Sequence, residues 1–450
     1  MANVQLKRFL FLVAFLGCSV LASAKVDTTF LSVKDFGARG DGGTDDQPAL
    51  LQCLKTAANH PGVVVVKVPY GTYLIQETLK VVIGKCDSLI IRGYGQGVRL
   101  PLIKTDKFIT ALDISCPLSA PKGKVSITGL AFKGNNPPYS PSHPYFDKGA
   151  FTVGIRIMNM TTAYISHNQV SDFYGEGIYL GYSDAGTAAP RHRFDHVVVS
   201  DNDVSNCWGL HATKSASGAH DDYGDGVYLS NVSSGEIYNN KIINNLQQTK
   251  QVGRAGLVLE YNVEDCLVKG NYISGYDRDI HLEADVGGHT IENNILEGSD
   301  FGILVFDNPA FRSKPIAIIG NKISNKGFPL KNDYTLIRNS QERCLISFYA
   351  AGNCRKGSKI INNDFEIDPG FTYKYSYIAR FIASGLTVKG NTFSSHLAAG
   401  VRKTVFFNAP MDSIVANIFQ NVDLHFATKY QKGTVEGNKL VGRVTTNLKM

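Results

Sequence analysis

Asn271-Tyr272-Ile273 is one copy of the phrase that decides the fold: an Asn, any residue, then an apolar residue entering a strand-like run. The phrase returns at Asn168, Asn202, Asn240, Asn271, Asn294, Asn321, Asn363, Asn391, Asn417 and Asn438. The shortest steps between copies are a little over 20 residues, and a period of that size indicates stacked coils. The unit is too short for helix pairs and too rich in β-branched residues for leucine-rich repeats. The sequence therefore predicts an all-β fold, a single-stranded right-handed parallel β-helix with one rung of several parallel sheets in each coil.

The repeated Asn suits a bend between strands for two reasons. Asn adopts the left-handed backbone conformation at low cost, and its side-chain amide can bond the coil above or below. The competing interpretation is a set of Asn-rich turns between unrelated strands. The number of copies favours the β-helix.

The N-terminus is typical of a secretory signal. Lys7 and Arg8 precede an apolar run at residues 9–20, and Ala22-Ser23-Ala24 is a small-residue cleavage site. We expect a signal peptide at residues 1–24, a β-helix domain at residues 25–450, and a secreted, periplasmic or extracellular location. Lipid attachment at Cys18 is a weaker alternative, because the residues before it fit that signal poorly.

Charge and hydropathy narrow the classes of partner. The formal net charge is +7, and removal of Lys7 and Arg8 leaves +5, a balance that weakly favours anionic partners. We expect no nucleic-acid binding, because no basic cluster is interleaved with aromatic residues. We also expect no membrane insertion, because no later segment is apolar over enough length. The expected assembly is a monomer.

A Gly- and Asp-rich stretch, DFGARGDGGTDD, occupies residues 35–46 and leads into a helical pattern. Thr44 is the expected cap of this helix, and an apolar stripe follows over residues 50–57. A buried strand is expected from Val63 to Val68. The first coil of a solenoid has unpaired backbone at its open end, so we expect the helix to cover it.

This stretch, its helix and the turn Val66-Lys67-Val68-Pro69-Tyr70-Gly71-Thr72-Tyr73 resemble the pectate-lyase-like superfamily. In particular they resemble the group containing rhamnogalacturonases, epimerases and phage tailspike depolymerases. The resemblance implies a secreted β-helix that acts on polysaccharide. It does not specify the reaction, because lyases, hydrolases, epimerases and binding proteins share the fold.

The chain offers few candidates for metal ligands or disulfides. Asp41, Asp45 and Asp46 could suggest calcium, but we favour turn and capping roles for them. No Cys or His spacing is typical of zinc. We expect no cofactor, with calcium left open, and Cys207 and Cys266 are candidates for a disulfide between coils.

Three segments share a finer template: Tyr174 to Leu180, Tyr223 to Leu229 and Tyr276 to Leu282. Strand alternation sends Tyr179, Tyr228 and His281 outward, so we expect them to form one column on the outer face. The first tyrosines of the three segments should form a second column. Exposed aromatic columns can bind sugars, so Tyr179 and Tyr228 are candidate substrate-binding residues, and ladder stacking that only stabilises the sheet is the alternative.

The third segment departs from the template, with Asp279 in place of Gly and His281 in place of Tyr, followed by Glu283. An Asp and a His on one exposed face, beside Tyr276, would form an acid–base set. The spacing Tyr276-x-x-Asp279-x-His281 is similar to the Y-G-x-D-P-H motif of mannuronan C5-epimerases and related alginate lyases. That resemblance implies Tyr276 and His281 as acid and base and Asp279 as their support, although Ile280 replaces the family's Pro.

The leading hypothesis is therefore a lyase or C5-epimerase acting on a uronate-containing polymer. Abstraction of the C5 proton requires a neutralised carboxylate, for which Arg254 and Arg278 are candidates, with Glu283 nearby as a further substrate contact. The expected partner is an anionic polysaccharide. Epimerisation and lyase cleavage remain open as outcomes.

Two alternatives remain. Asp221, Asp222 and Asp225 could supply the carboxyl groups of a glycoside hydrolase. The non-catalytic interpretation is that these Asp residues solvate a loop or bind calcium. A non-catalytic carbohydrate-binding protein is the other. Long connections at residues 183–196, 208–224 and 246–254 indicate a cleft in this region, because loops on rigid scaffolds carry function.

Overall fold

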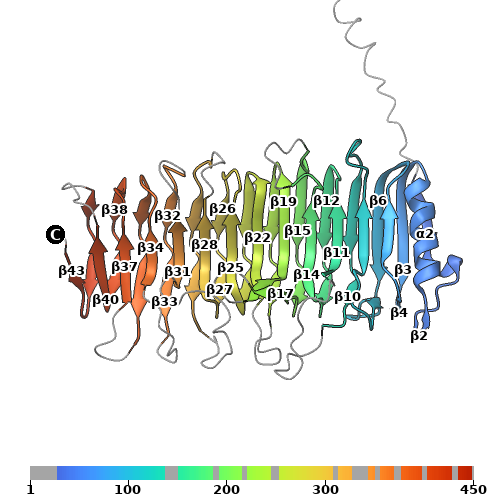
Figure 1. The fold of residues 1–450 in the computed structure, drawn as a ribbon, viewed down its shortest axis with the longest axis horizontal. Coiled ribbons are helices and arrows are strands. Elements are labelled where there is room, and N and C mark those ends of the chain that lie inside the picture. Colours follow the sequence, from blue (N-terminus) through green and yellow to red (C-terminus); the bar gives the residue numbers. More distant parts are fainter. Residues whose placement is uncertain are drawn as a thin grey trace, which may run out of the picture.

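The chain forms a right-handed parallel β-helix, as the repeat predicts (Figure 1). The computed structural model describes residues 28–136, 151–185, 192–214, 220–244, 253–307, 313–326, 343–349, 355–368, 377–397, 403–427 and 434–447. Three parallel sheets of 14, 14 and 13 strands, here called sheets A, B and C, run the length of the solenoid. The expected signal peptide and Cys18 lie outside the described residues. Within those residues, no helix has the length and apolarity needed to cross a membrane.

Each coil contributes one strand to each sheet, except the first, whose β1 and β2 are followed by α2 and not by a strand of sheet C. Sheet A contains β1 (Thr28–Ser32), β3 (Gly62–Pro69), β6 (Cys86–Tyr94), β9 (Lys124–Thr128), β12 (Thr162–Ser166), β15 (His196–Ser200), β20 (Gly235–Tyr238), β23 (Cys266–Lys269), β26 (Thr290–Glu292), β29 (Ala317–Ile319), β32 (Lys359–Ile361), β35 (Thr387–Lys389), β38 (Ser413–Val415) and β41 (Val435–Glu436). Sheet B contains β2 (Asp41–Asp45), β4 (Thr72–Leu74), β7 (Leu102–Lys104), β10 (Ala131–Lys133), β13 (Gln169–Ser171), β16 (Asp203–Ser205), β21 (Lys241–Ile243), β24 (Tyr272–Ser274), β27 (Ile295–Glu297), β30 (Lys322–Ser324), β33 (Asp364–Ile367), β36 (Thr392–Ser395), β39 (Ile418–Gln420) and β42 (Lys439–Val441). Sheet C contains β5 (Leu79–Val82), β8 (Leu112–Ser115), β11 (Thr152–Met158), β14 (Gly175–Gly181), β19 (Asp225–Val232), β22 (Gly253–Val263), β25 (Tyr276–Glu283), β28 (Phe301–Phe306), β31 (Cys344–Tyr349), β34 (Tyr377–Phe381), β37 (Lys403–Phe407), β40 (Val422–Phe426) and β43 (Thr445–Thr446).

The repeated Asn residues form a continuous ladder between sheets A and B. In each step the Oδ1 atom of one Asn accepts hydrogen bonds from the backbone N–H and the side-chain amide of the Asn one coil earlier, as between Asn294 and Asn271 at 2.9 Å. The same pattern runs from Asn168 to Asn438. The expectation that the ladder Asn itself adopts the left-handed conformation is wrong. The residue before it does so, for example Asn293 with φ of 55° and Gly270 with φ of 64°.

A helix covers the N-terminal end of the solenoid, as expected (Figure 1). The short 3-10 helix η1 (Val33–Phe36) precedes β2, and α2 (Gln47–Asn59) follows it, with Leu50, Leu54 and Ala57 packed into the core. Thr44 is not the helix cap, because it lies in β2 and the N-cap residue is Asp46. The Asp46 carboxylate accepts the N–H groups of Arg39 and Gly40, so the acidic stretch organises the turn, as we favoured.

The core consists of inward columns along the solenoid. In sheet C, Ile178, Val227, Leu257 and Ile280 lie in register on successive strands and are fully buried. Burial of each such side chain contributes about 1.5–3 kcal/mol. Cys207 and Cys266 are buried free thiols, so the expected disulfide between them is absent.

Candidate functional site

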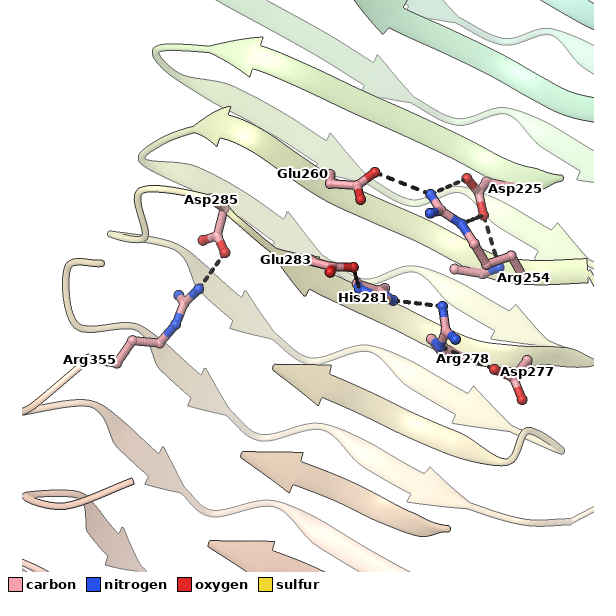
Figure 2. A network of polar contacts seen from close by, with 10 residues as sticks. Asp225, Arg254, Glu260, Asp277, Arg278, His281, Glu283, Asp285 and Arg355 are labelled. Carbon is pink, nitrogen blue, oxygen red and sulfur yellow. Dashed lines mark hydrogen bonds and ion pairs between the residues drawn. The ribbon is translucent and has the colours of Figure 1, made fainter. Parts of the chain in front are cut away.

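The outer face of sheet C carries a dense cluster of charged side chains on β14, β19, β22 and β25 (Figure 2). We call it the carboxylate cluster and define it as Glu176, Asp225, Arg254, Glu260, Asp277, Arg278, His281 and Glu283. Successive strands place its members next to one another, because Ser230, Glu260 and Glu283 lie in register across β19, β22 and β25. Most of these groups are buried, although charged side chains usually face solvent.

Arg254 links two carboxylates of the cluster. Its Nε and one terminal nitrogen bind Asp225 at 3.1 and 2.8 Å, and the same terminal nitrogen lies 3.4 Å from Glu260. Asp225 also accepts the backbone N–H of Ala255 at 3.0 Å. The Asp225 carboxylate is therefore held in a bidentate pair, the strongest geometry for such a contact.

A second chain of contacts runs along β25. Arg278 pairs with Asp277 at 3.1 Å and places an N–H group 3.0 Å from Nδ1 of His281. Nε2 of His281 lies 2.9 Å from Glu283. Because a guanidinium only donates, Nδ1 of His281 accepts, and Nε2 carries the proton that is donated to Glu283. Burial and the nearby Arg278 lower the pKa of His281 to about 3, so the imidazole is neutral.

Glu260 and Glu283 lie in register on adjacent strands, and their pKa values are shifted in opposite directions. The hydrogen bond from His281 lowers the pKa of Glu283. Burial raises the pKa of Glu260, and the negative charges of Asp225 and Glu283 add to that effect against the opposing charge of Arg254. Neighbouring carboxyl groups with divergent pKa values are the arrangement in which one acts as an acid and the other as a base or nucleophile.

Glu176 is another buried carboxyl of the cluster. Burial, reinforced by the charge of Asp225, raises its pKa well above the ordinary value. Its Oε2 atom has no hydrogen-bond partner among the described residues. Glu176 is therefore a second carboxyl that favours the protonated form.

Two tyrosines line the cluster, as the sequence predicts. Tyr179 and Tyr228 lie in register and stack with ring centroids 4.8 Å apart, and the Arg254 guanidinium lies 5.8 Å from the centre of the Tyr228 ring. The predicted column continues to His281, but Val258 of β22 lies between Tyr228 and His281. Tyr228 is only 6% exposed and hydrogen-bonds to Glu260, so it holds that carboxyl in place.

The predicted set of Tyr276, Asp279 and His281 does not share one outer face, and that expectation is wrong. Asp279 occupies a position equivalent to Gly226 and Gly256, where an added side chain would meet the core residues Ile242 and Ile273. Asp279 is accordingly fully buried in the interior and accepts a 2.6 Å hydrogen bond from Ser299. Tyr276 is also fully buried in the core. Only His281 of the three lies on the outer face.

The alternative Asp cluster is only partly described. Asp221 and Asp222 lie in β18 (His220–Tyr223), which pairs antiparallel with β17 (Gly209–Lys214), and their side chains lie outside the described part of the structure. Asp225 is described and is engaged by Arg254. Asp225, the described member of this Asp group, is thus held in an ion pair and is not a free carboxyl.

The sequence analysis missed Glu176 and Glu260. Glu176 follows the same Tyr-Gly pair as Asp225, so the template itself held the signal. Glu260 lies on β22, whose residues Arg254 to Glu260 lack the aromatic positions of the template. Aligning the inward Leu257 and Leu259 with the other coils would have revealed the extra strand.

Among the described residues, no group of three or more His, Cys, Asp and Glu side chains has the geometry to hold a metal ion. Arg254 and Arg278 occupy the space between the carboxylates of the cluster (Figure 2). The described side chains of this site present carboxyl groups, two guanidinium groups and a neutral imidazole.

Comparison with known proteins agrees with the β-helix fold. Residues 30–113 match the family model described as rhamnogalacturonase A/epimerase, pectate lyase-like. The chain is a parallel β-helix, and its N-terminal part is similar to this family. Residues 208–368, which contain most of the cluster, also match a model described as periplasmic copper-binding protein (NosD). The described residues of that segment offer no fitting ligand cluster, so we derive no chemistry from copper.

Solved structures share the fold at low identity. The N-terminal fragment of bacteriophage phi29 gene product 12 is similar with a TM-score of 0.64 and 14% identity, over 93% of this chain and 72% of that chain. An α-1,3-glucanase from Streptomyces thermodiastaticus is similar with a TM-score of 0.51 and 14% identity, over 93% of this chain and 68% of that one. A non-secreted LysM effector of Penicillium expansum is 53% identical over 51 residues, which is 11% of this chain and only 4% of that protein.

Proposed function

We propose that this protein is a polysaccharide-active enzyme that hydrolyses glycosidic bonds with Glu260 and Glu283. The observation that supports this most directly is the pair of adjacent carboxyl groups with opposite pKa shifts. The match to a polysaccharide-active family over residues 30–113 agrees with it. In glycoside hydrolysis one carboxyl donates a proton to the leaving oxygen, while an ionised carboxylate activates water or attacks the anomeric carbon.

The surroundings of the two carboxyl groups support a different role for each. Glu260, with its raised pKa, is the proton donor, and Tyr228 and Arg254 fix its position. Glu283 is kept ionised by His281 and is about one third exposed, so it can reach a substrate from the surface. When Glu260 releases its proton to the leaving group, Arg254 balances the new negative charge.

In this proposal, His281 is a positioning residue for Glu283. Both of its ring nitrogens are engaged, one by Arg278 and the other by Glu283, so no lone pair faces the substrate. A lyase or C5-epimerase remains the second candidate, because a neutral imidazole beside an arginine is the state required for removal of a proton next to a uronate carboxylate. That reaction would require the Arg278 contact to open.

The charge of the cluster favours a neutral polymer over the anionic one that we expected. The three carboxylates of Asp225, Asp277 and Glu283 outnumber the two guanidinium groups of Arg254 and Arg278, which are already paired with carboxylates. Glu176 and Glu260, whose pKa values are raised, add no positive charge. An anionic polymer would meet net repulsion here. We propose a neutral glycan as substrate, and secretion or a periplasmic location as the setting.

The test is a panel of neutral and uronate polysaccharides, followed by reducing-end release and ultraviolet absorbance. Reducing ends without absorbance would support hydrolysis, and absorbance at an unsaturated uronate would establish a lyase instead. Glu260→Gln and Glu283→Gln should each lower turnover by at least about a hundredfold. Glu236→Gln, an exposed glutamate on sheet A, is the matched control and should leave turnover unchanged. Full activity in either cluster variant would refute the assignment.

A further inference from the structure

A tight hairpin directly follows β6, near the end of the solenoid that α2 covers (Figure 1). Gln96 and Arg99 exchange two backbone hydrogen bonds of 2.9 and 3.1 Å, which leaves Gly97 and Val98 at the tip. Gly97 has a φ of 59°, whereas Val98 has no positive φ, and in such a type II′ turn only the first central residue must be Gly. Val98 is 95% exposed, so neither the turn nor the core explains an apolar residue at this tip.

The outer face of sheet A beside the hairpin is basic and aromatic. Lys67 and Arg92 lie in register on β3 and β6 and point outward, since the residue before each of them is buried. The Lys67 ammonium lies 4.7 Å from the centre of the Phe30 ring, and Phe30 is 58% exposed. Tyr94 follows Arg92 on the same face and is 41% exposed. We call this surface the hairpin patch and define it as Phe30, Lys67, Arg92, Tyr94, Val98 and Arg99.

The first four strands of sheet A, β1, β3, β6 and β9, present no carboxylate on their outer face. Their outward positions, all within the described residues, hold the two cations of the patch on β3 and β6 together with Lys124. Asp87 is exposed, but it lies at the bulge at the opposite end of β6 from the hairpin. Later coils of the same sheet differ, because Lys269 there is paired with Glu292 at 2.7 Å. The patch therefore keeps an unbalanced positive charge that attracts anions.

The partner of this patch must match both its cations and its apolar tip. The formal net charge of +7 favours an anionic partner, which the neutral-glycan site on sheet C does not supply. A soluble anionic polymer would neutralise the cations but would give Val98 no apolar environment. The surface of an anionic bilayer offers both, since its headgroups attract Lys and Arg and its interface takes up aromatic and aliphatic side chains.

We propose that the hairpin patch docks the protein on a lipid bilayer that carries anionic headgroups. Val98 lies below the headgroups, Phe30 and Tyr94 lie at their level, and the three cations contact their phosphates. The contact stays at the surface of one leaflet, and no segment crosses the bilayer. The inference goes beyond the proposed hydrolase and does not depend on it, because the patch lies on sheet A and contains no member of the carboxylate cluster.

The first test is co-sedimentation with vesicles of phosphatidylglycerol and phosphatidylcholine in equal parts, with pure phosphatidylcholine as the reference. Each variant is purified after removal of the expected signal peptide, because the apolar run at residues 9–20 would bind lipid by itself. The double variant Arg92→Gln/Arg99→Gln should bind the anionic vesicles roughly 20- to 30-fold more weakly, about fivefold for each cation. Val98→Ser should bind them roughly three- to tenfold more weakly.

Matched variants separate the patch from general charge and general apolarity. Lys359→Gln/Lys389→Gln removes the same charge from exposed positions of sheet A in later coils, and Val82→Ser changes an exposed valine on sheet C. Both should bind as strongly as the parent protein. Unchanged unfolding midpoints in every variant would show that the fold persists.

A fluorescent reporter tests the depth of the hairpin directly. The chain has a single tryptophan, Trp208, and it is fully buried, so its emission should be insensitive to vesicles. In Val98→Trp protein the added indole should shift its emission to shorter wavelength with anionic vesicles and not with pure phosphatidylcholine. No shift with anionic vesicles would overturn the placement of the tip below the headgroups.

The remaining outcomes decide the partner. Binding to anionic vesicles that weakens in both patch variants and not in the matched variants would support the inference. Equal loss in the Lys359/Lys389 variant would show that net charge alone drives binding and would overturn it. Binding to soluble polyphosphate that is tighter than binding to anionic vesicles, with Val98→Ser unaffected, would overturn the lipid as partner.

Discussion

The Asn ladder allows a quantitative prediction about Asn294→Ala. The Asn294 side chain accepts two hydrogen bonds from Asn271, and it donates one to the Val268 carbonyl and one to Asn321, all between 2.9 and 3.0 Å. All four are buried. At about 1 kcal/mol net for each bond, the substitution should lower the free energy of unfolding by about 4 kcal/mol.

Asn438→Ala is the matched comparison, because Asn438 ends the described ladder and is only partly buried. Water can replace its partners, so we expect a loss of about 1 kcal/mol there. Urea unfolding followed by circular dichroism would give both values, and hydrogen exchange would show whether the loss is confined to the neighbouring coils. A loss below about 1 kcal/mol for Asn294→Ala, or equal losses at both sites, would refute the ladder as a main source of stability.

Three further predictions concern the site. His281→Leu removes the hydrogen bond that lowers the pKa of Glu283, so that pKa rises and the acid limb of the kcat/KM profile moves to higher pH, whereas loss of activity at every pH would identify the imidazole as the base. Arg254→Met leaves the buried Asp225 without a counter-charge and should cost about 3 kcal/mol in urea unfolding, most of which Asp225→Leu should restore in the double variant; no recovery would contradict the pairing argument. Asp279→Asn should leave turnover unchanged, because burial raises the pKa of this interior carboxyl and a neutral amide resembles its protonated form; lost turnover would return Asp279 to the site.

The sequence predicted the fold well because the determinant is local and repeated. The ladder Asn, the inward aliphatic residues and the helix over the N-terminal end each leave a pattern that a single coil already displays. The position of left-handed backbone was missed because it falls on varied residues before the Asn, such as His167 and Ala416.

The site was predicted only in part because its geometry depends on register between coils. Tyr179, Tyr228, His281 and Glu283 do lie on one face, as the alternation suggested, and Arg254 and Arg278 contact that group. Simple alternation fails at Asp279, because the Gly at this position in the other coils marks an inward position next to the inward Ile280. Asp279 was therefore assigned to the wrong face. The pairing of Glu260 with Glu283 depends on a strand that carries no aromatic marker, and only the stacked coils reveal it.

The ladder also separates what must stay fixed from what is free to vary. Successive ladder Asn residues are 21 apart at Asn417 and 42 apart at Asn321, yet their hydrogen bonds have the same length, 2.9 Å. Each doubling of a connecting segment costs only about 0.6 kcal/mol in closure entropy. Insertions between sheets B and C can therefore accumulate without disturbing the stack, whereas removal of part of a coil breaks the ladder. Such a scaffold can exchange its connecting segments, and with them its specificity, one coil at a time.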